Sequence, residues 1–232
     1  MSGTEINIPC KDGSMMGYLS LPKSGSGPGV VVMQEIFGVN QVMRDITDMF
    51  AAEGFVALCP DLFWRIEPNI NITDKSKAEW DRAFSLFGKF DRDAGVHDIS
   101  ATIACLRAIK GCNGKAGTVG FCLGGLLAYL SATRTGTDAS VGFYGVSIPD
   151  FLAESKNIST PLMLHIAGKD GFVPPAAQDA MHKSLDGNKL CTLYDYPDQD
   201  HAFARMGGEH YDDGAAKQAL SRTVGFFKTH LA

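Results

Sequence analysis

Short apolar runs recur along the whole chain and predict β-strands. Near the N-terminus, residues 5–8 and 16–21 alternate between apolar and polar positions, and the Lys11-Asp12-Gly13 sequence between them predicts a hairpin turn. The later runs are continuously apolar, which is typical of central strands covered on both faces. These predicted buried strands cover residues 29–33, 55–59, 116–119, 140–144, 161–166 and 190–194.

Segments with apolar residues at helical spacing lie between these runs. Asn40 and Asp91 each precede such a segment and can cap its first turn. Residues 62–74 show no clear period, so we expect a long loop there, and long loops in compact domains are often functional. The predicted helices cover residues 41–52, 75–88 and 92–109, a run just after Cys122, and about 175–185 and 213–230.

The order of these elements predicts the fold class. Strands alternate with helices after an initial antiparallel hairpin, and this order is typical of an α/β fold. We expect a mostly parallel central sheet with helices on both faces. No repeat, low-complexity tract or linker divides the chain, so a single domain over residues 1–232 is predicted.

Composition and charge limit the partners that the chain can have. Hydrophobic residues make up 45% of the 232 residues, and the formal net charge of −5 argues against nucleic acid or an anionic membrane surface as a partner. No apolar run is long enough for a membrane span, and no signal peptide is evident. The six cysteines are scattered, without metal-site spacing, which suits free thiols. We therefore expect a cytoplasmic monomer that uses no metal and no cofactor.

The stretch from Gly120 to Gly125 carries the most specific local pattern. It follows a predicted strand, precedes an apolar helical run, and places Cys122 between flanking glycines, as in a nucleophile elbow with Cys in place of Ser. Glycines remove the clashes of such a sharp turn, and a helix that begins at the nucleophile favours thiolate over thiol. The alternative interpretation is a buried cysteine in a tight turn, since free Cys is often buried.

Two further polar residues follow predicted strands in a meaningful order. Asp170 follows the strand at 161–166, and His201 follows the strand at 190–194. Nucleophile, acid and histidine is the chain order of α/β-hydrolases. Imidazole can accept the thiol proton, and the carboxylate can orient the imidazole and stabilise its charged form. The three residues therefore predict a catalytic triad.

The sequence resembles the dienelactone hydrolase (carboxymethylenebutenolidase) family, whose members are Cys-His-Asp enzymes of the α/β-hydrolase superfamily. The resemblance extends over nearly the whole chain. Its most specific segments are Gln34-Glu35-Ile36-Phe37-Gly38, Cys59-Pro60-Asp61-Leu62, Gly120-Phe121-Cys122-Leu123-Gly124-Gly125, Phe143-Tyr144-Gly145-Val146, Asp170-Gly171-Phe172-Val173-Pro174 and His201-Ala202-Phe203-Ala204-Arg205.

The resemblance implies a role for each matching residue of the catalytic machinery. Cys122 would be the nucleophile, His201 the base and Asp170 its orienting partner. Glu35 would hold the resting cysteine protonated, since a nearby carboxylate disfavours thiolate by like-charge repulsion. The backbone N–H groups of Ile36 and Leu123 would form the oxyanion hole. Without the resemblance, the residues favour a Glu35 that caps a loop or pairs with a surface lysine.

The resemblance also suggests substrate-binding residues, and here the sequence departs from the family. Arg205 matches an arginine that holds the substrate carboxylate, and a guanidinium suits that contact. Trp80 and Phe84 stand where the family has a second arginine and a tyrosine, and together with Tyr144 they complete the expected substrate-binding set. The expected substrate is a small lactone or ester, and the family reaction converts 4-carboxymethylenebut-2-en-4-olide to maleylacetate.

Three alternatives to this reaction remain at this stage. Trp80 and Phe84 favour a broader carboxylesterase or thioesterase with a more apolar acyl pocket. A non-catalytic binding protein on the α/β-hydrolase fold is a second alternative, although such a protein has no need of Cys122, Asp170 and His201 together. A redox-sensing thiol protein is a third, and the lack of an obvious resolving cysteine beside Cys122 argues against it.

Overall fold

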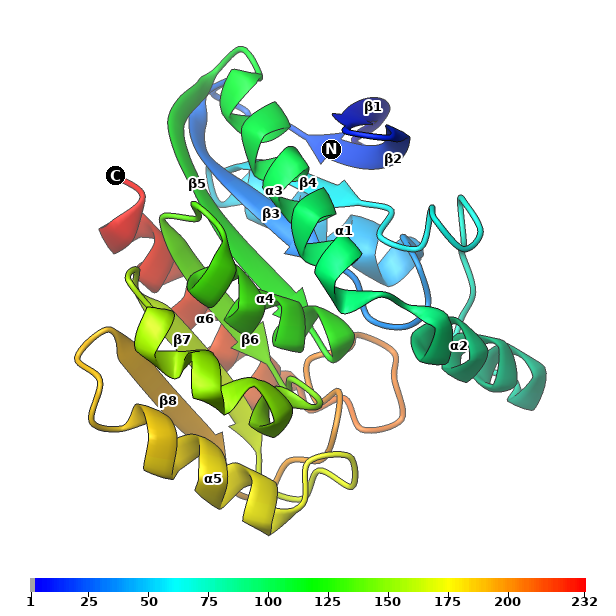
Figure 1. Ribbon diagram of the computed structural model, residues 1–232. Helices are drawn as coiled ribbons and strands as arrows, with labels where there is room; N and C mark the ends of the chain where they lie inside the picture. Colours follow the sequence, from blue (N-terminus) through cyan, green and yellow to red (C-terminus); the bar gives the residue numbers. More distant parts are fainter. Residues whose placement is uncertain (1–2) are drawn as a thin grey trace.

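A single eight-stranded sheet runs through the computed structural model, which describes residues 3–232 (Figure 1). The strands lie in the order β1-β2-β4-β3-β5-β6-β7-β8. Pairing is antiparallel between β1 and β2 and between β2 and β4, and parallel everywhere else. The strands are β1 (Thr4–Cys10), β2 (Gly13–Ser20), β3 (Gly27–Met33), β4 (Val56–Pro60), β5 (Cys112–Phe121), β6 (Ala139–Phe143), β7 (Leu162–Ala167) and β8 (Cys191–Tyr196). The predicted parallel sheet with an N-terminal antiparallel hairpin is confirmed.

Helices cover both faces of the sheet, as predicted. Helices α3, α4, η1 and α5 lie on the face toward the viewer of Figure 1, and α1 and α6 lie behind it. The helices are α1 (Gln41–Ala52), α2 (Lys77–Lys89), α3 (Arg92–Ala108), α4 (Leu123–Arg134), the 3₁₀ helix η1 (Ile148–Asn157), α5 (Pro175–Leu185) and α6 (Asp213–His230). Within residues 3–232, none of these helices is both long and apolar enough to cross a membrane.

Side-chain caps explain where several helices begin. Asn40 accepts a hydrogen bond from the N–H of Met43 at 3.1 Å, and Asp91 caps α3 in the same way, as their positions predicted. Helix α2 begins two residues later than predicted because Ser76 caps it, and Glu79 in the first turn accepts a hydrogen bond from the Ser76 hydroxyl.

Two elements differ from the sequence prediction. Strand β5 extends from Cys112 to Phe121 rather than over residues 116–119 alone, because Cys112 at its polar end also pairs with Gly27 of β3, across a register shift. The 3₁₀ helix η1 was not predicted, since three residues per turn leave no α-helical period to detect.

Apolar side chains are buried between the sheet and the helices on both of its faces. The side chains of Val30, Val31 and Val32 are fully buried in β3. On the face of α1 and α6, the rings of Phe50, Phe55 and Phe227 meet edge to face, with centroids 6.0–6.2 Å apart. Such aromatic clusters contribute both buried area and favourable ring geometry. This cluster fixes α6 against the sheet.

The carboxyl ends of the parallel strands form the edge at which polar residues collect. Cys122 directly follows β5, Tyr144 follows β6, Asp170 follows β7 and His201 follows β8. The chain after β3 adds Glu35 to the same edge. Sites in parallel sheets form at this edge because loops from different strands meet there.

The aromatic cluster gives a stability prediction. Phe227→Ala should lower the free energy of unfolding by about 3–5 kcal/mol, since it removes a fully buried ring and leaves a cavity. Phe226→Ala is the matched control, because the ring of Phe226 is only partly buried. This substitution should lower the free energy of unfolding by less than about 1.5 kcal/mol. Urea unfolding of both variants measures the difference. Equal losses would mean that α6 is not held by this cluster.

Candidate active site

Cys122 lies at a sharp turn between β5 and α4. Its backbone has φ 57° and ψ −112°, a left-handed conformation that is strained for a non-glycine residue. The turn is so tight that a Cβ on Gly120 would collide with the carbonyl of Gly124, and a Cβ on Gly124 with the carbonyl of Met33. The N–H of Cys122 is used in a hydrogen bond to Phe143 at 3.1 Å. The predicted strand–turn–helix geometry is therefore present.

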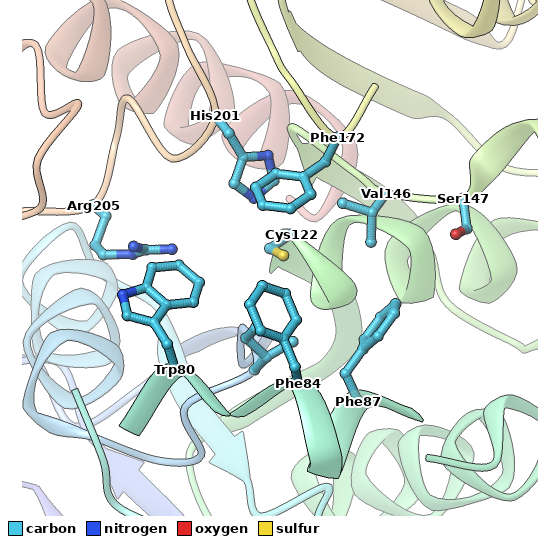
Figure 2. A pocket seen from close by; sticks show the side chains of 10 residues that line it. Trp80, Phe84, Phe87, Cys122, Val146, Ser147, Phe172, His201 and Arg205 are labelled. Atoms are coloured by element: carbon cyan, nitrogen blue, oxygen red, sulfur yellow. The ribbon is translucent and has the colours of Figure 1, made fainter. Parts of the chain in front are cut away.

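His201 and Asp170 form a buried pair beside this turn. Asp170 Oδ2 lies 2.8 Å from Nδ1 of His201, and the other carboxylate oxygen accepts the N–H of Phe172 at 2.8 Å. Both side chains are almost completely buried. Since Nδ1 faces the carboxylate, Nε2 is the nitrogen left for chemistry. Figure 2 shows the ring of His201 directed toward the Cys122 sulfur.

The charge balance around His201 favours the imidazolium. Burial alone would lower the pKa of His201, but the negative charge of Cys122 in its ionised form and the Asp170 carboxylate raise it to about 10. A thiolate and an imidazolium therefore stabilise each other in this site once the proton has passed from sulfur to nitrogen.

Cys122 and His201 line the same cavity, of about 150 Å³ (Figure 2). Its walls are mainly aromatic and aliphatic, and α2 supplies one side of it. The other lining residues are Ile36, Trp80, Phe84, Phe87, Val146, Ser147, Phe172 and Arg205. Trp80, Phe84 and Arg205, which the resemblance implied as substrate-binding residues, all line this cavity. Such a lining suits an apolar group more than a charged one.

The two N–H groups expected to form the oxyanion hole belong to Ile36, which lines the cavity, and to Leu123, which directly follows Cys122. Leu123 begins α4, so its N–H has no partner within the helix, and Ile36 lies in the loop that follows β3. Within residues 3–232, no backbone acceptor bonds to either N–H. The two N–H groups expected to bind an oxyanion therefore remain available for that task.

Glu35 and Arg205 form a buried ion pair. Nε and Nη2 of Arg205 donate to the two carboxylate oxygens of Glu35 at 2.7 and 3.1 Å, and Nη1 donates to Asp74 at 3.1 Å. Burial opposes the charge of Arg205, but Glu35 holds the pKa of the guanidinium above its ordinary value. In the described residues, no hydrogen bond joins Glu35 to the Cys122 sulfur. A substrate carboxylate would have to displace Glu35 or Asp74 in order to bind Arg205.

Tyr144 lies next to the site without lining its cavity. Its ring packs against those of His201 and Phe203 at centroid distances of 5.1 and 5.5 Å. Burial and the charge of nearby Glu35 raise the pKa of Tyr144 well above its ordinary value, although its hydroxyl makes no hydrogen bond of good geometry within the described chain. The structure thus places Tyr144 behind the imidazole rather than among the residues that a substrate in this cavity would touch.

Apart from Phe87, which continues the aromatic stripe of Trp80 and Phe84, four residues of the site were absent from the sequence prediction. Asp74 reaches Arg205 from the loop before α2, and Val146, Ser147 and Phe172 line the cavity. Val146 and Phe172 lie in segments that match the family, whereas Asp74 and Ser147 belong to no recognisable motif. As for metals, no group of three or more His, Cys, Asp or Glu side chains in residues 3–232 could hold an ion.

Comparisons with known proteins match the chain over nearly its whole length. A protein of Azospirillum brasilense is 46% identical over 231 residues, which are 98% of this chain and 99% of its own length. Carboxymethylenebutenolidase 1 of Cupriavidus pinatubonensis is 37% identical over 220 residues, or 94% of each protein. The fold matches that of the dienelactone hydrolase-like promiscuous phosphotriesterase P91 from metagenomic libraries. That match has a TM-score of 0.82 at 20% identity and covers 99% of this chain and 98% of P91.

The sequence model of the dienelactone hydrolase family spans residues 15–231. Together with the relatives above, it establishes the family and supports the α/β-hydrolase fold seen here. The chain therefore belongs to the dienelactone hydrolase family and is a hydrolase of ester or lactone bonds.

Proposed function

We propose that the protein opens a small lactone or ester by attack of the Cys122 sulfur, through a thioester acyl-enzyme. The observation that carries the proposal is the shared cavity of Cys122 and His201, with Asp170 bound to the far side of the imidazole. A strained turn that presents a thiol to an oriented imidazole is what nucleophilic catalysis requires.

The reaction follows from these positions. The thiol proton passes to Nε2 of His201 as the sulfur attacks the carbonyl carbon. The N–H groups of Ile36 and Leu123 stabilise the negative oxygen that forms. Collapse of this intermediate breaks the C–O bond, the imidazolium protonates the departing oxygen, and a thioester remains on Cys122. His201 then takes a proton from water, the hydroxide attacks the thioester, and the free acid leaves as the sulfur is released.

Glu35 is part of the proposed site as the residue that restrains the resting thiol. A carboxylate near the sulfur disfavours thiolate, and the pairing with Arg205 compensates part of that charge. The strength of the restraint thus depends on how tightly Arg205 holds Glu35. For the reaction of this family, the proposed substrate is dienelactone and the proposed product maleylacetate, in line with the name carboxymethylenebutenolidase carried by relatives.

A broader carboxylesterase or thioesterase is the second candidate function. The aromatic lining favours it, because Trp80, Phe84, Phe87 and Phe172 surround the cavity with apolar surface. Relative rates on dienelactone and on short p-nitrophenyl esters distinguish the two candidates. A preference for the lactone supports the first, and a preference for the aryl esters supports the second.

Removal of the nucleophile tests the proposal directly. Cys122→Ala should lower kcat on any accepted ester by a factor of about 10³ or more, since no thioester can form. Cys112→Ala is the matched control, because that thiol lies at the opposite end of β5, and it should keep full activity. Initial rates and circular dichroism of both variants give the answer. Substantial turnover by a folded Cys122→Ala enzyme would contradict the mechanism and would leave a binding protein as the better description.

Substitution of Asp170 should change the pKa of His201 in a defined direction. Its carboxylate helps to raise the pKa of His201, so Asp170→Asn should lower that pKa and reduce kcat by roughly 10³-fold. The comparison is cleanest in a Cys122→Ala background, where the thiolate no longer contributes. NMR titration of the His201 ring should show a lower pKa in the double variant than in Cys122→Ala alone. An unchanged pKa would mean that Asp170 does not act on this imidazole.

A further inference from the structure

The cavity that holds Cys122 continues into a second, larger one. The inner cavity has a volume of about 150 Å³, and the neighbouring outer cavity has a volume of about 600 Å³. The side chains that line both cavities are those of Trp80, Phe172, His201 and Arg205. Exposed residues such as Lys75 and His210 border the outer cavity, so it forms the mouth through which a substrate reaches the sulfur.

The proposed chemistry fixes which part of an ester faces each cavity. In the tetrahedral intermediate, the former carbonyl carbon carries the sulfur, the negative oxygen, the departing oxygen and the acyl substituent. The negative oxygen faces the N–H groups of Ile36 and Leu123, and the departing oxygen must lie within reach of Nε2 of His201. Because His201 stands where the two cavities join, the departing group extends into the outer one.

The acyl substituent is left with the part of the inner cavity that lies away from this junction. The residues that line the inner cavity and not the outer one include Phe84, Phe87, Val146 and Ser147. Figure 2 shows Val146 and Phe87 on the far side of the sulfur from Arg205. Apart from the Ser147 hydroxyl, these side chains are apolar, so they favour an uncharged acyl group.

The two cavities differ in the size of the group that they can hold. A cavity as large as the inner one holds about one benzene-sized group, and here the reacting carbonyl takes part of that space. The outer cavity has about four times the volume and opens to solvent. A small acyl group and a large departing alcohol therefore match the shape of the site.

Most charged side chains of the outer cavity already have a partner. Asp74 pairs with both Lys75 and Arg205 at 3.1 Å, and His210 lies 3.8 Å from Asp200. Three glycines, at positions 171, 207 and 208, leave the remaining wall without side chains. Size and shape, rather than net charge, therefore decide which departing groups the outer cavity admits.

The lactone named above fits the same orientation. Its carboxymethylene group is attached to the carbon that bears the ring oxygen, which is the oxygen that departs. The carboxylate thus lies on the side of Arg205 and the outer cavity, and the ring carbons next to the carbonyl face the apolar compartment.

We propose that the outer cavity binds the departing alcohol, and that the enzyme also hydrolyses esters in which a small apolar acid is joined to a large alcohol. This assignment rests on the function proposed above for Cys122 and His201. Phe87 limits the acyl group, because its ring lies on the far wall of the inner cavity, and Gly171 leaves room for the alcohol.

A pair of reversed esters tests the orientation without any change in the protein. 2-Naphthylmethyl acetate and methyl 2-naphthylacetate are isomers that carry the naphthyl group on opposite sides of the ester bond. Each kcat/KM is divided by the rate constant of alkaline hydrolysis, which corrects for intrinsic reactivity. The corrected value should be at least about tenfold higher for 2-naphthylmethyl acetate. Equal values, or a preference for methyl 2-naphthylacetate, would overturn the proposal.

Gly171→Leu should narrow the alcohol site. A Cβ on Gly171 meets nothing within 4 Å beyond its chain neighbours, so the larger side chain projects into open space. The ratio of kcat/KM on 2-naphthylmethyl acetate to that on methyl acetate should fall about five- to tenfold. Gly187→Leu adds the same side chain at an exposed glycine outside both cavities and should keep the wild-type ratio.

Phe87→Ala should widen the acyl side alone. The ratio of kcat/KM on methyl 2-naphthylacetate to that on methyl acetate should rise about fivefold, while the ratio for 2-naphthylmethyl acetate stays within about twofold. Phe226→Ala removes a partly buried ring that lines neither cavity, and it should change neither ratio. Equal shifts of both ratios in Phe87→Ala would refute its place on the acyl side.

The outcomes separate this proposal from the catalytic mechanism. A wild-type enzyme that opens the lactone but cleaves neither naphthyl ester, or that prefers methyl 2-naphthylacetate, refutes the alcohol site and leaves the mechanism intact. Failure of the mechanism would appear instead as turnover by a folded Cys122→Ala enzyme. In that case, a crystal structure of this variant with uncleaved 2-naphthylmethyl acetate decides the orientation. A naphthyl ring beside Gly171 supports the proposal, and a ring beside Phe87, or no bound ester, refutes it.

Discussion

The turn at Cys122 is the constraint on which the rest of the site depends. A non-glycine residue with φ 57° costs of order 1–3 kcal/mol, and it persists only where the surroundings leave no alternative. Here the N–H of Cys122 is bonded to Phe143, and the N–H of Gly124 is bonded to Gln34 at 3.1 Å. Hydrogen bonds to the ends of both neighbouring strands, β6 and β3, therefore hold the turn in place, and the sulfur lies at the carboxyl edge of the sheet.

Asp170 and His201 lie at the same edge of the sheet, because each also follows a parallel strand. Strands β7 and β8 are parallel neighbours, so the loops that follow them place Asp170 and His201 side by side, although 31 positions separate the two in sequence. The ion pair of Glu35 and Arg205 links the loop after β3 to the loop after β8, and it joins residues 170 positions apart. Buried charges of this kind are tolerated because each has its counter-charge within hydrogen-bond distance.

The sheet, most helices and the edge that carries the candidate site were predictable from the sequence, because apolar runs mark the buried strands and polar residues after those runs share one edge. Cys122, Asp170 and His201 could be placed in this way. The partners of Arg205 could not, since Asp74 reaches it from an irregular loop whose path follows from tertiary packing alone. The longer β5 and the 3₁₀ helix η1 also escaped prediction, because polar strand ends and 3₁₀ turns carry no distinctive period.

Helix α2 contributes much to the lining of the cavity and little to the buried core. It carries Trp80, Phe84 and Phe87 on the cavity wall, yet Ala83 and Leu86 are its only buried residues. Figure 1 shows it standing clear of the two helical layers. Changes on its outer turns can therefore accumulate at little cost to folding. The lining of the cavity can in this way change while Cys122, His201 and Asp170 keep their positions at the edge of the sheet.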